Sequence, residues 1–228
     1  MSRKPRLGLV HTSATLVPVF QQLCAAKLPG VDTFNIADDS LIKDCIARGE
    51  LTPLTARRVV QHLVSAEEAG ADVILVTCSS IGPAVDAGAS LIGVPVVRVD
   101  QPMADEAVAT GKRVGVIATL PTTLAPTADL IRRRAQAAKR DVDITSRLCE
   151  GAFDALMGGN PAKHDELVGR ALAELSTQVD VIVLAQASMA RVVETLPAEV
   201  RRVPILASPP LAVEHLAQVF AARQEAGA

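Results

Sequence analysis

Short apolar runs alternate with longer amphipathic segments along the whole chain. The runs are rich in Val, Ile and Leu and show no strict polar–apolar alternation, which indicates β-strands buried on both faces. Between them, apolar residues recur at helical spacing, as in residues 52–70 and 162–179. Because such strands are typical of a parallel sheet covered by helices, the pattern predicts an α/β fold. The predicted strands span residues 7–10, 72–78, 94–99, 113–119, 179–185 and 203–208.

The chain also repeats its own pattern. Buried strands resemble one another in any α/β protein, but that alone does not impose a common order and offset on the matching segments. We therefore predict two similar parallel-sheet domains related by a pseudo-twofold axis, one of residues 1–98 plus 208–228 and one of residues 99–207. The apolar segment 211–220 is expected to pack back on the first half or to serve a subunit interface. The matching pairs are 71–85 with 179–193, 6–18 with 113–126, and 94–108 with 203–217.

Helix boundaries are marked at two places. Thr52 and Pro53 are start signals for the first long helix, and Gly70 is a stop signal for it. Asp38 and Asp39 have two interpretations: they could act together as acid and base, or a carboxylate there could cap the helix that follows. We favour the cap.

The residues that follow the strands are the candidates for a binding site. Ligands of open parallel sheets bind beyond the carboxyl ends of the strands, so two facing domains predict a shared active-site cleft. Small polar residues also cap helices after strands, which accounts for part of the set without any function. The candidates are His11, Thr12, Ser13, Cys78, Ser79, Ser80, Thr119, Thr122, Thr123, Gln186, Ala187 and Ser188.

Cys78 is the candidate reactive group. It lies where a predicted strand ends and a helix begins, and there the backbone N–H groups and the helix dipole favour a thiolate. Ser79 and Ser80 could donate further hydrogen bonds to that thiolate or to a bound carboxylate. The alternative is a small buried core cysteine, the usual role of a free cysteine. We expect that role for the three cysteines in helical or loop context, Cys24, Cys45 and Cys149.

Composition and charge exclude several classes of function. The chain has 228 residues, a formal net charge of −2, four Phe and no Trp or Tyr, which gives no basis for binding nucleic acid. It has no apolar run of the roughly 18–20 residues that a membrane span needs, and the short apolar stretch near its first residues leads us to expect no secretory signal. Four widely spaced cysteines without a C-x-x-C motif indicate reduced thiols in a cytoplasmic protein and no zinc site. Glycine-rich phosphate-binding motifs are absent, so no nucleotide cofactor is expected.

The segment GADVILVTCSSIG (70–82), the GVIAT-x-x-T turn (115–122) and the duplicated pattern resemble the aspartate/glutamate/hydantoin racemase superfamily. The resemblance runs over nearly the whole chain. It implies two α/β domains with a cleft between them, no pyridoxal phosphate, no metal, and a small anionic carboxylate as substrate. It also implies a homo-oligomer, since members are commonly dimers or larger. Thr119, Thr122 and Thr123 resemble the carboxylate-binding turn of that family, and Thr12 and Ser13 hold the equivalent place in the first half.

Racemases of this family use two cysteines, one from each half, on opposite faces of the α-carbon. Cys78 matches the first cysteine, but the internal repeat puts Gln186 in place of the second. Glutamine only donates and accepts hydrogen bonds near neutral pH. Cys149 is the other cysteine of the second half, and we expect it in a connecting segment.

The hypotheses are therefore an amino-acid racemase-like isomerase with a single thiol, a one-cysteine decarboxylase, lyase or diacid isomerase, and a non-catalytic small-anion binding protein. Two further residues have open interpretations. His11 could carry protons beside Cys78 or be structural. Asp100 could line the cleft or orient a neighbouring side chain.

Overall fold

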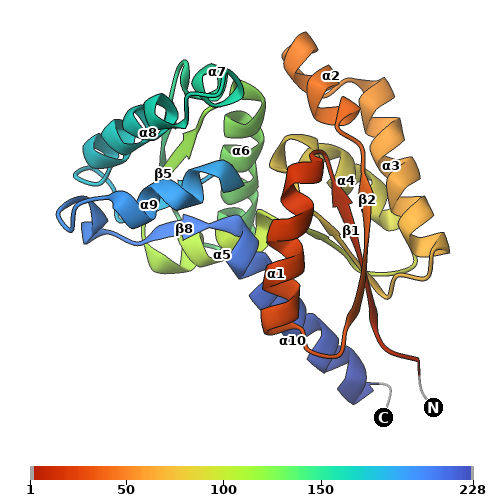
Figure 1. Ribbon diagram of the computed structural model, residues 1–228. Helices are drawn as coiled ribbons and strands as arrows, with labels where there is room; N and C mark the ends of the chain where they lie inside the picture. The colour runs from red at the N-terminus through yellow and green to blue at the C-terminus, as the bar shows by residue number, and fades with distance from the viewer. Residues whose placement is uncertain (1–2, 227–228) are drawn as a thin grey trace. The chain divides into compact units, whose positions relative to one another are not determined.

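The structure is a computed structural model that describes residues 3–226, and it divides into two compact units (Figure 1). One unit comprises Met1–Pro102 with Pro209–Ala228, and the other comprises Met103–Ser208. Each is built on a four-stranded sheet whose strand pairs are all parallel. The predicted α/β class with two similar halves is confirmed. The pseudo-twofold axis and the shared cleft concern the placement of one unit against the other and stay predictions.

The two sheets have the same topology. Their strand orders are β2-β1-β3-β4 and β6-β5-β7-β8, so the first strand of each unit lies between its second and third. Each strand of the first sheet has its counterpart in the second, 107 to 111 residues later in the chain. The strands are β1 (Arg6–His11), β2 (Asp32–Ala37), β3 (Val73–Val76) and β4 (Val96–Arg98), then β5 (Arg113–Ala118), β6 (Asp143–Leu148), β7 (Val181–Leu184) and β8 (Ile205–Ala207).

Strands β2 and β6 were not predicted from the sequence. Both are edge strands, each with one neighbour in its sheet. Their sequences, DTFNIA and DITSRL, mix polar and apolar residues, and most of their side chains are half-buried or exposed. Because these two strands are covered on only part of their surface, they lack the apolar run that marked the other strands, including the edge strands β4 and β8.

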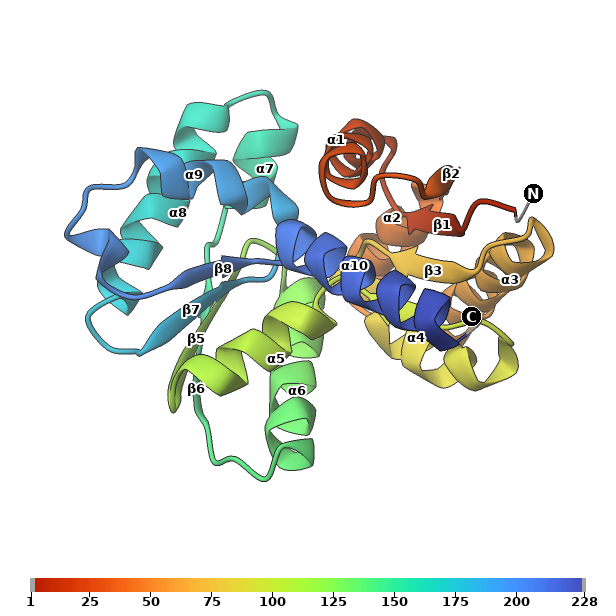
Figure 2. The same cartoon turned by 90° about the horizontal axis from the view of Figure 1, so that it is seen from below.

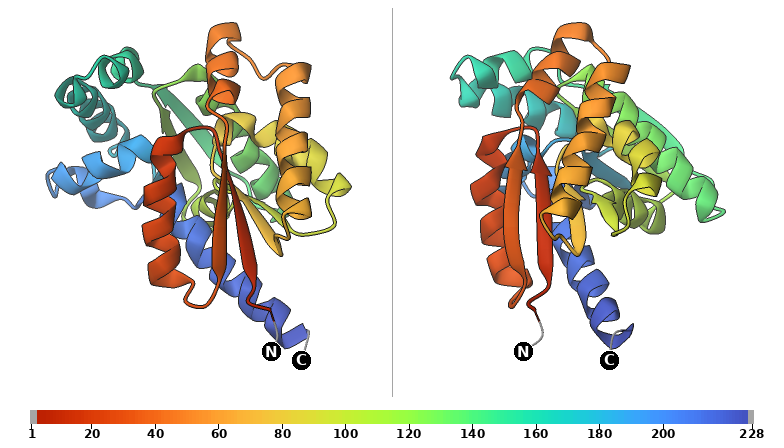
Figure 3. Two further views of the ribbon diagram at one scale, coloured as in Figure 1. Left: turned by 45° about the vertical axis from the view of Figure 1, so that its right-hand side comes forward. Right: turned by 90° about the vertical axis from the view of Figure 1, so that its right-hand side faces the viewer.

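In the first unit, helices cover both faces of the sheet (Figures 1 and 3). Helices α1 (Val17–Lys27) and α10 (Ser208–Ala226) pack on one face, where Phe20 and Phe220 join the buried side chains of β1 and β3. The segment 211–220 therefore packs on the first half as expected. The opposite face is covered by α2 (Ser40–Arg48), α3 (Pro53–Glu68) and α4 (Gly82–Gly88). Single 3-10 turns lie at Ala14–Leu16, Ser79–Ile81 and Ala89–Leu91.

The second unit is layered in the same way (Figure 2). Helices α5 (Gln101–Thr110) and α6 (Pro121–Ala137) lie on one side of its sheet. Helices α7 (Ala152–Met157), α8 (Pro161–Leu175) and α9 (Ala190–Thr195) lie on the other side, where Leu172 and Val192 pack against Ile182. Its 3-10 turns are Ala187–Met189 and Val200–Arg202.

The predicted helix signals act as expected. The Thr52 hydroxyl accepts a hydrogen bond from the Thr55 N–H at 3.2 Å, and Pro53 is the first residue of α3. Gly70 follows the helix with φ of +86°, a left-handed conformation that favours glycine. Within residues 3–226, no helix has both the length and the apolar character needed to cross a membrane.

Candidate active site

Cys78 lies at the carboxyl edge of the first sheet, two residues after β3. Its backbone is extended, with φ of −130° and ψ of 120°, and the turn Ser79–Ile81 follows at once and leads into α4. Hydrogen bonds reach Cys78 from the Thr12 side chain, from the backbone N–H groups of Ser80 and Ile81, and from the Ser80 side chain. Cys78 is half-buried, and neutral hydrogen-bond donors surround its sulfur.

Burial raises the pKa of the Cys78 thiol, and the four hydrogen bonds lower it by less. The expectation that the strand–helix junction favours a thiolate is therefore wrong. The reason is that Cys78 packs against the apolar cluster of Leu41, Cys45 and Ile81, where a charge loses its solvation. At neutral pH the resting group is the thiol, which can give a proton.

The other cysteines are core residues, as predicted. Cys24, Cys45 and Cys149 are 4%, 1% and 4% exposed, and burial raises the pKa of each to about 11. Cys149 directly follows β6 and packs in the apolar core of the second unit, so it is shielded from a ligand. Among residues 3–226, no group of three or more His, Cys, Asp or Glu side chains is arranged to hold a metal ion.

His11 ends β1 and is fully buried. Its Nδ1 lies 2.9 Å from the Thr77 hydroxyl and its Nε2 lies 2.9 Å from the Asn35 side-chain oxygen, so the ring links β1 to β2 and to the residue that directly follows β3. Burial lowers the pKa of His11, and the Asn35 contact offsets only part of that effect. A neutral ring satisfies both contacts, since one nitrogen donates and the other accepts. Direct contact with a ligand would require these bonds to break. Thr77, which the sequence did not single out, links His11 to the residue next to it, Cys78.

The remaining candidates of the first unit lie around the same edge. Thr12, Ser79 and Ser80 are buried, while Ser13 is half-buried. The Ser13 hydroxyl lies 2.7 Å from that of Thr15, so it belongs to the turn before α1. The structure therefore gathers Thr12 and Ser80 on the sulfur and leaves Ser13 on a neighbouring turn.

Gln186 holds the position after β7 that Cys78 holds after β3. Its Oε1 accepts a hydrogen bond from the Thr119 N–H at 2.6 Å and another from the Thr119 hydroxyl at 2.9 Å. A backbone N–H can only donate, so the amide orientation is fixed. The Nε2 group has no hydrogen-bond partner among residues 3–226 and offers two N–H donors on a half-buried side chain.

The threonine turn of the second unit surrounds the start of α6. The Thr123 N–H donates to Leu120 O at 3.1 Å, and Thr123 itself is 3% exposed. The Thr122 hydroxyl oxygen is buried without a hydrogen-bond partner within residues 3–226. Ser188 is half-buried in the turn Ala187–Met189 that follows Gln186. Hydroxyl and amide donors therefore collect at the carboxyl edge of this sheet too.

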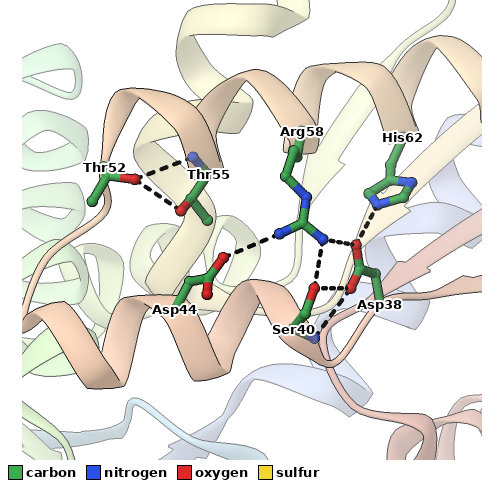
Figure 4. A network of polar contacts seen from close by, with 7 residues as sticks. All are labelled: Asp38, Ser40, Asp44, Thr52, Thr55, Arg58 and His62. Carbon is green, nitrogen blue, oxygen red and sulfur yellow. Dashed lines mark hydrogen bonds and ion pairs between the residues drawn. The ribbon is translucent and has the colours of Figure 1, made fainter.

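Asp38 is the centre of a polar network at the end of β2 (Figure 4). Its Oδ1 accepts at 3.1 Å from the N–H of Ser40, the first residue of α2, whereas the N-cap residue Asp39 makes no side-chain hydrogen bond to the helix. Its Oδ2 accepts from Arg58 at 2.7 Å and lies 2.9 Å from His62 Nε2. Arg58 also donates to Asp44 of α2 at 3.1 Å. The network ties α2 to α3, and α2 packs against the turn that follows Cys78.

The family follows from the sequence comparison. A family model described as Asp/Glu/Hydantoin racemase matches residues 7–216. The chain belongs to the Asp/Glu/hydantoin racemase family. No curated protein matches it by sequence.

Solved structures of racemases share the fold of this chain, although their sequence identity to it is low. A glutamate racemase from Francisella tularensis in complex with D-glutamate is 14% identical with a TM-score of 0.74, over 97% of this chain and 82% of that one. A glutamate racemase from Bacillus anthracis is 18% identical with a TM-score of 0.70, over 96% and 82%. An allantoin racemase from Klebsiella pneumoniae is 18% identical with a TM-score of 0.67, over 96% and 89%.

Proposed function

We propose that this family member catalyses cofactor-independent proton transfer at the α-carbon of a small carboxylate, with Cys78 as the group that carries the proton. The observation that carries the proposal is the set of four hydrogen-bond donors around the sulfur of the half-buried Cys78, at the carboxyl edge of a parallel sheet. Core cysteines elsewhere in the chain lie among apolar side chains.

In this mechanism the second unit supplies hydrogen-bond donors. When a proton leaves or reaches an α-carbon, negative charge develops on the neighbouring carboxylate oxygens as an enediolate. Fixed N–H and O–H donors stabilise such a charge more than they stabilise the ground state. The free amide nitrogen of Gln186 suits that role, and Thr119, Thr122, Thr123 and Ser188 lie at the same sheet edge. Thr12, Ser13, Ser79 and Ser80 would hold the substrate on the side of Cys78.

One-sided chemistry follows if Cys78 is the single acid–base group. A racemase-like isomerase needs a second group to exchange a proton on the opposite face, and an amide held by Thr119 cannot do so. Cys149 is too deeply buried to replace it. A single thiol supports exchange or protonation on one face only.

Decarboxylation is the second candidate, and the protonated resting state of Cys78 favours it. In a malonate-like acid the bond to one carboxylate breaks, carbon dioxide leaves, and the electron pair enters the enediolate. The Cys78 thiol then transfers its proton to the α-carbon, and water reprotonates the thiolate. A diacid isomerase would use the same thiol, whereas a non-catalytic protein would bind the anion through the donors alone.

A turnover screen tests the proposal. Wild-type protein, Cys78→Ser and Cys45→Ser would be incubated with amino acids, hydantoins and substituted malonates, followed by optical rotation and carbon dioxide release. The Cys45 variant alters a buried thiol on the neighbouring helix α2 and serves as the matched control. We expect turnover of one substrate class that Cys78→Ser abolishes and Cys45→Ser keeps. Binding without turnover in wild-type protein, unchanged in Cys78→Ser, would support the non-catalytic alternative.

A further inference from the structure

An ion-pair network lies directly behind the turn that follows Cys78. Arg98, the last residue of β4, is 3% exposed, and Asp100 is fully buried. The Arg98 guanidinium donates to both carboxylate oxygens of Asp100, from Nε at 2.9 Å and from Nη2 at 2.7 Å. Its Nη1 donates to Asp86 of α4 at 2.6 Å. Asp100 therefore orients a neighbouring side chain, which decides between its two interpretations.

The guanidinium also lies against Gly82, the first residue of α4. A Cβ atom added to Gly82 would overlap Nη2 and Cζ of Arg98 and would lie 2.7 Å from Nε. The same glycine directly follows the turn Ser79–Ile81 and closes it, because the Gly82 N–H donates to Ser79 O. Ser80 and Ile81, the two residues before it, direct their N–H groups at the sulfur of Cys78.

The second unit lacks this arrangement at the corresponding positions. Leu184 pairs with Ala207 where Val76 pairs with Arg98, and α9 begins with Ala190 where α4 begins with Gly82. The glycine and the arginine thus occur together in the unit that carries the cysteine, and alanine replaces both in the unit that carries Gln186. An alanine at the first helical position is compatible with a small residue at the end of the last strand, but not with Arg98.

We propose that Arg98, held by Asp100 and Asp86, is a positioning residue for Cys78. Its rigid guanidinium packs against Gly82. This contact fixes the turn whose N–H groups donate hydrogen bonds to the sulfur of Cys78. Arginine suits this role because its planar fork binds a carboxylate in two places and keeps one orientation, which lysine cannot do. The effect on turnover rests on the proposed function, whereas the effect on the reactivity of the thiol does not.

The test is the rate at which iodoacetamide alkylates Cys78 in native protein, followed by peptide mass spectrometry as a function of pH. In Gly82→Ala the new methyl group displaces the guanidinium, and in Arg98→Lys the fork is lost. Misaligned N–H donors stabilise the thiolate less, so we expect the rate at about pH 8 to fall roughly tenfold, equivalent to a rise of about one pKa unit. With the proposed substrates, both variants should lower kcat and change KM by a smaller factor.

Gly88→Ala is the matched control, because its added Cβ would lie 2.6 Å from Val60 at the far end of the same helix. It should lower the melting temperature and leave the pH profile of alkylation unchanged. The proposal is overturned if folded Gly82→Ala or Arg98→Lys keeps the wild-type profile, or if Gly88→Ala shifts it equally. Asp86→Asn, at the partly exposed end of the network, gives a milder version of the test should both variants fail to fold. If Cys78→Ser keeps turnover, the proposed function fails while the alkylation result still decides the role of Arg98.

Discussion

Thr119 donates two hydrogen bonds to Gln186 Oε1, from its backbone N–H at 2.6 Å and from its hydroxyl at 2.9 Å. The corresponding pair in the first unit is Thr12 and Cys78, which are also joined by a hydrogen bond. In both units, the threonine after the first strand therefore contacts the residue that follows the third strand. The contact fixes an amide in one unit and a thiol in the other, so the two sheet edges offer different chemistry from one framework.

Replacing Gln186 by glutamate distinguishes the role of its Oε1 atom, which Thr119 binds, from the role of its Nε2 donor group. A glutamate oxygen can still accept both hydrogen bonds from Thr119, but the N–H donors are lost and a negative charge is added. We expect kcat to fall by about 10²–10³, the usual effect of removing one oxyanion donor. Thermal stability should change little. Gln178→Glu makes the same change on an exposed side chain and should leave turnover at the wild-type level. Equal rates for the two variants would exclude Gln186 from the site.

The four cysteines should differ in reactivity. Cys78 is half-buried and the others are buried, so iodoacetamide should modify Cys78 alone in native protein. Because burial raises the pKa of Cys78, its alkylation rate should still be rising with pH at about pH 9. All four should react after unfolding in urea. A rate that is already constant between about pH 6 and 8 would mean a thiolate at rest and would contradict the protonated resting state.

His11 should stabilise the first unit in its neutral form. The pKa of His11 is lowered in the folded protein. The amount that the neutral ring adds to the free energy of unfolding is therefore complete above the unfolded pKa of about 6.5, and it is lost as the pH falls below that pKa. His11→Leu leaves Asn35 without this partner, whereas the Thr77 hydroxyl keeps its hydrogen bond to Val10 O at 3.2 Å, so we expect a cost of about 1–3 kcal/mol in unfolding free energy. Urea unfolding at about pH 7 and 5.5 should show wild-type stability falling with acid, and the variant falling less.

His215→Leu is the control for His11, since His215 is half-buried on α10, and we expect an effect within about 0.5 kcal/mol. A His11→Leu protein as stable as wild type would show that the contacts of His11 with Thr77 and Asn35 do not stabilise the first unit.

Asp38 should govern stability at lower pH. Burial raises its pKa, but hydrogen bonds from Ser40 and His62 and the charge of Arg58 outweigh burial and lower it to about 2. The amount that ionised Asp38 adds to the free energy of unfolding is complete above the unfolded pKa of about 4, and it is lost as the pH falls from there toward 2. After allowing for solvent screening we expect about 1–2 kcal/mol.

Asp38→Asn should therefore be less stable than wild type at about pH 6, and the difference should shrink to roughly a third of that value at about pH 2.5. Asp39→Asn, whose carboxylate pairs with Lys43 on the surface, is the matched control. A constant difference between wild type and Asp38→Asn across this range would show that the charge of Asp38 does not matter.

Local patterns were enough to predict the central strands and the edge strands β4 and β8, the ends of α3 and the position of Cys78 after β3. These features depend on residues close together in the chain, such as Thr52 with Thr55 or the apolar run before Cys78. The edge strands β2 and β6 escaped prediction because each is covered on only part of its surface.

The electrostatics of the site depended on residues that lie far apart in the sequence. The pKa of Cys78 is raised by burial against α2, more than thirty residues away, which no local signal at TCSS reveals. In the sequence, Arg98 is a single charged residue in the apolar segment 94–99, and nothing nearby indicates its partners. Only the structure joins it to Gly82 and Asp100. The signal that could have found it was Gly82 after the Cys78 turn, where the internal repeat has Ala190 after Gln186.

The most direct test of the single-thiol account is the stereochemistry of deuterium uptake in heavy water. Wild-type protein and Cys78→Ala would be given prochiral substituted malonates and both enantiomers of candidate amino acids, and the α-position would be followed by NMR. The account predicts deuterium on one face only, with or without loss of carbon dioxide, and no uptake with Cys78→Ala. Deuterium on both faces with loss of optical rotation, or uptake that persists in Cys78→Ala, would contradict it and mean that another group moves the proton.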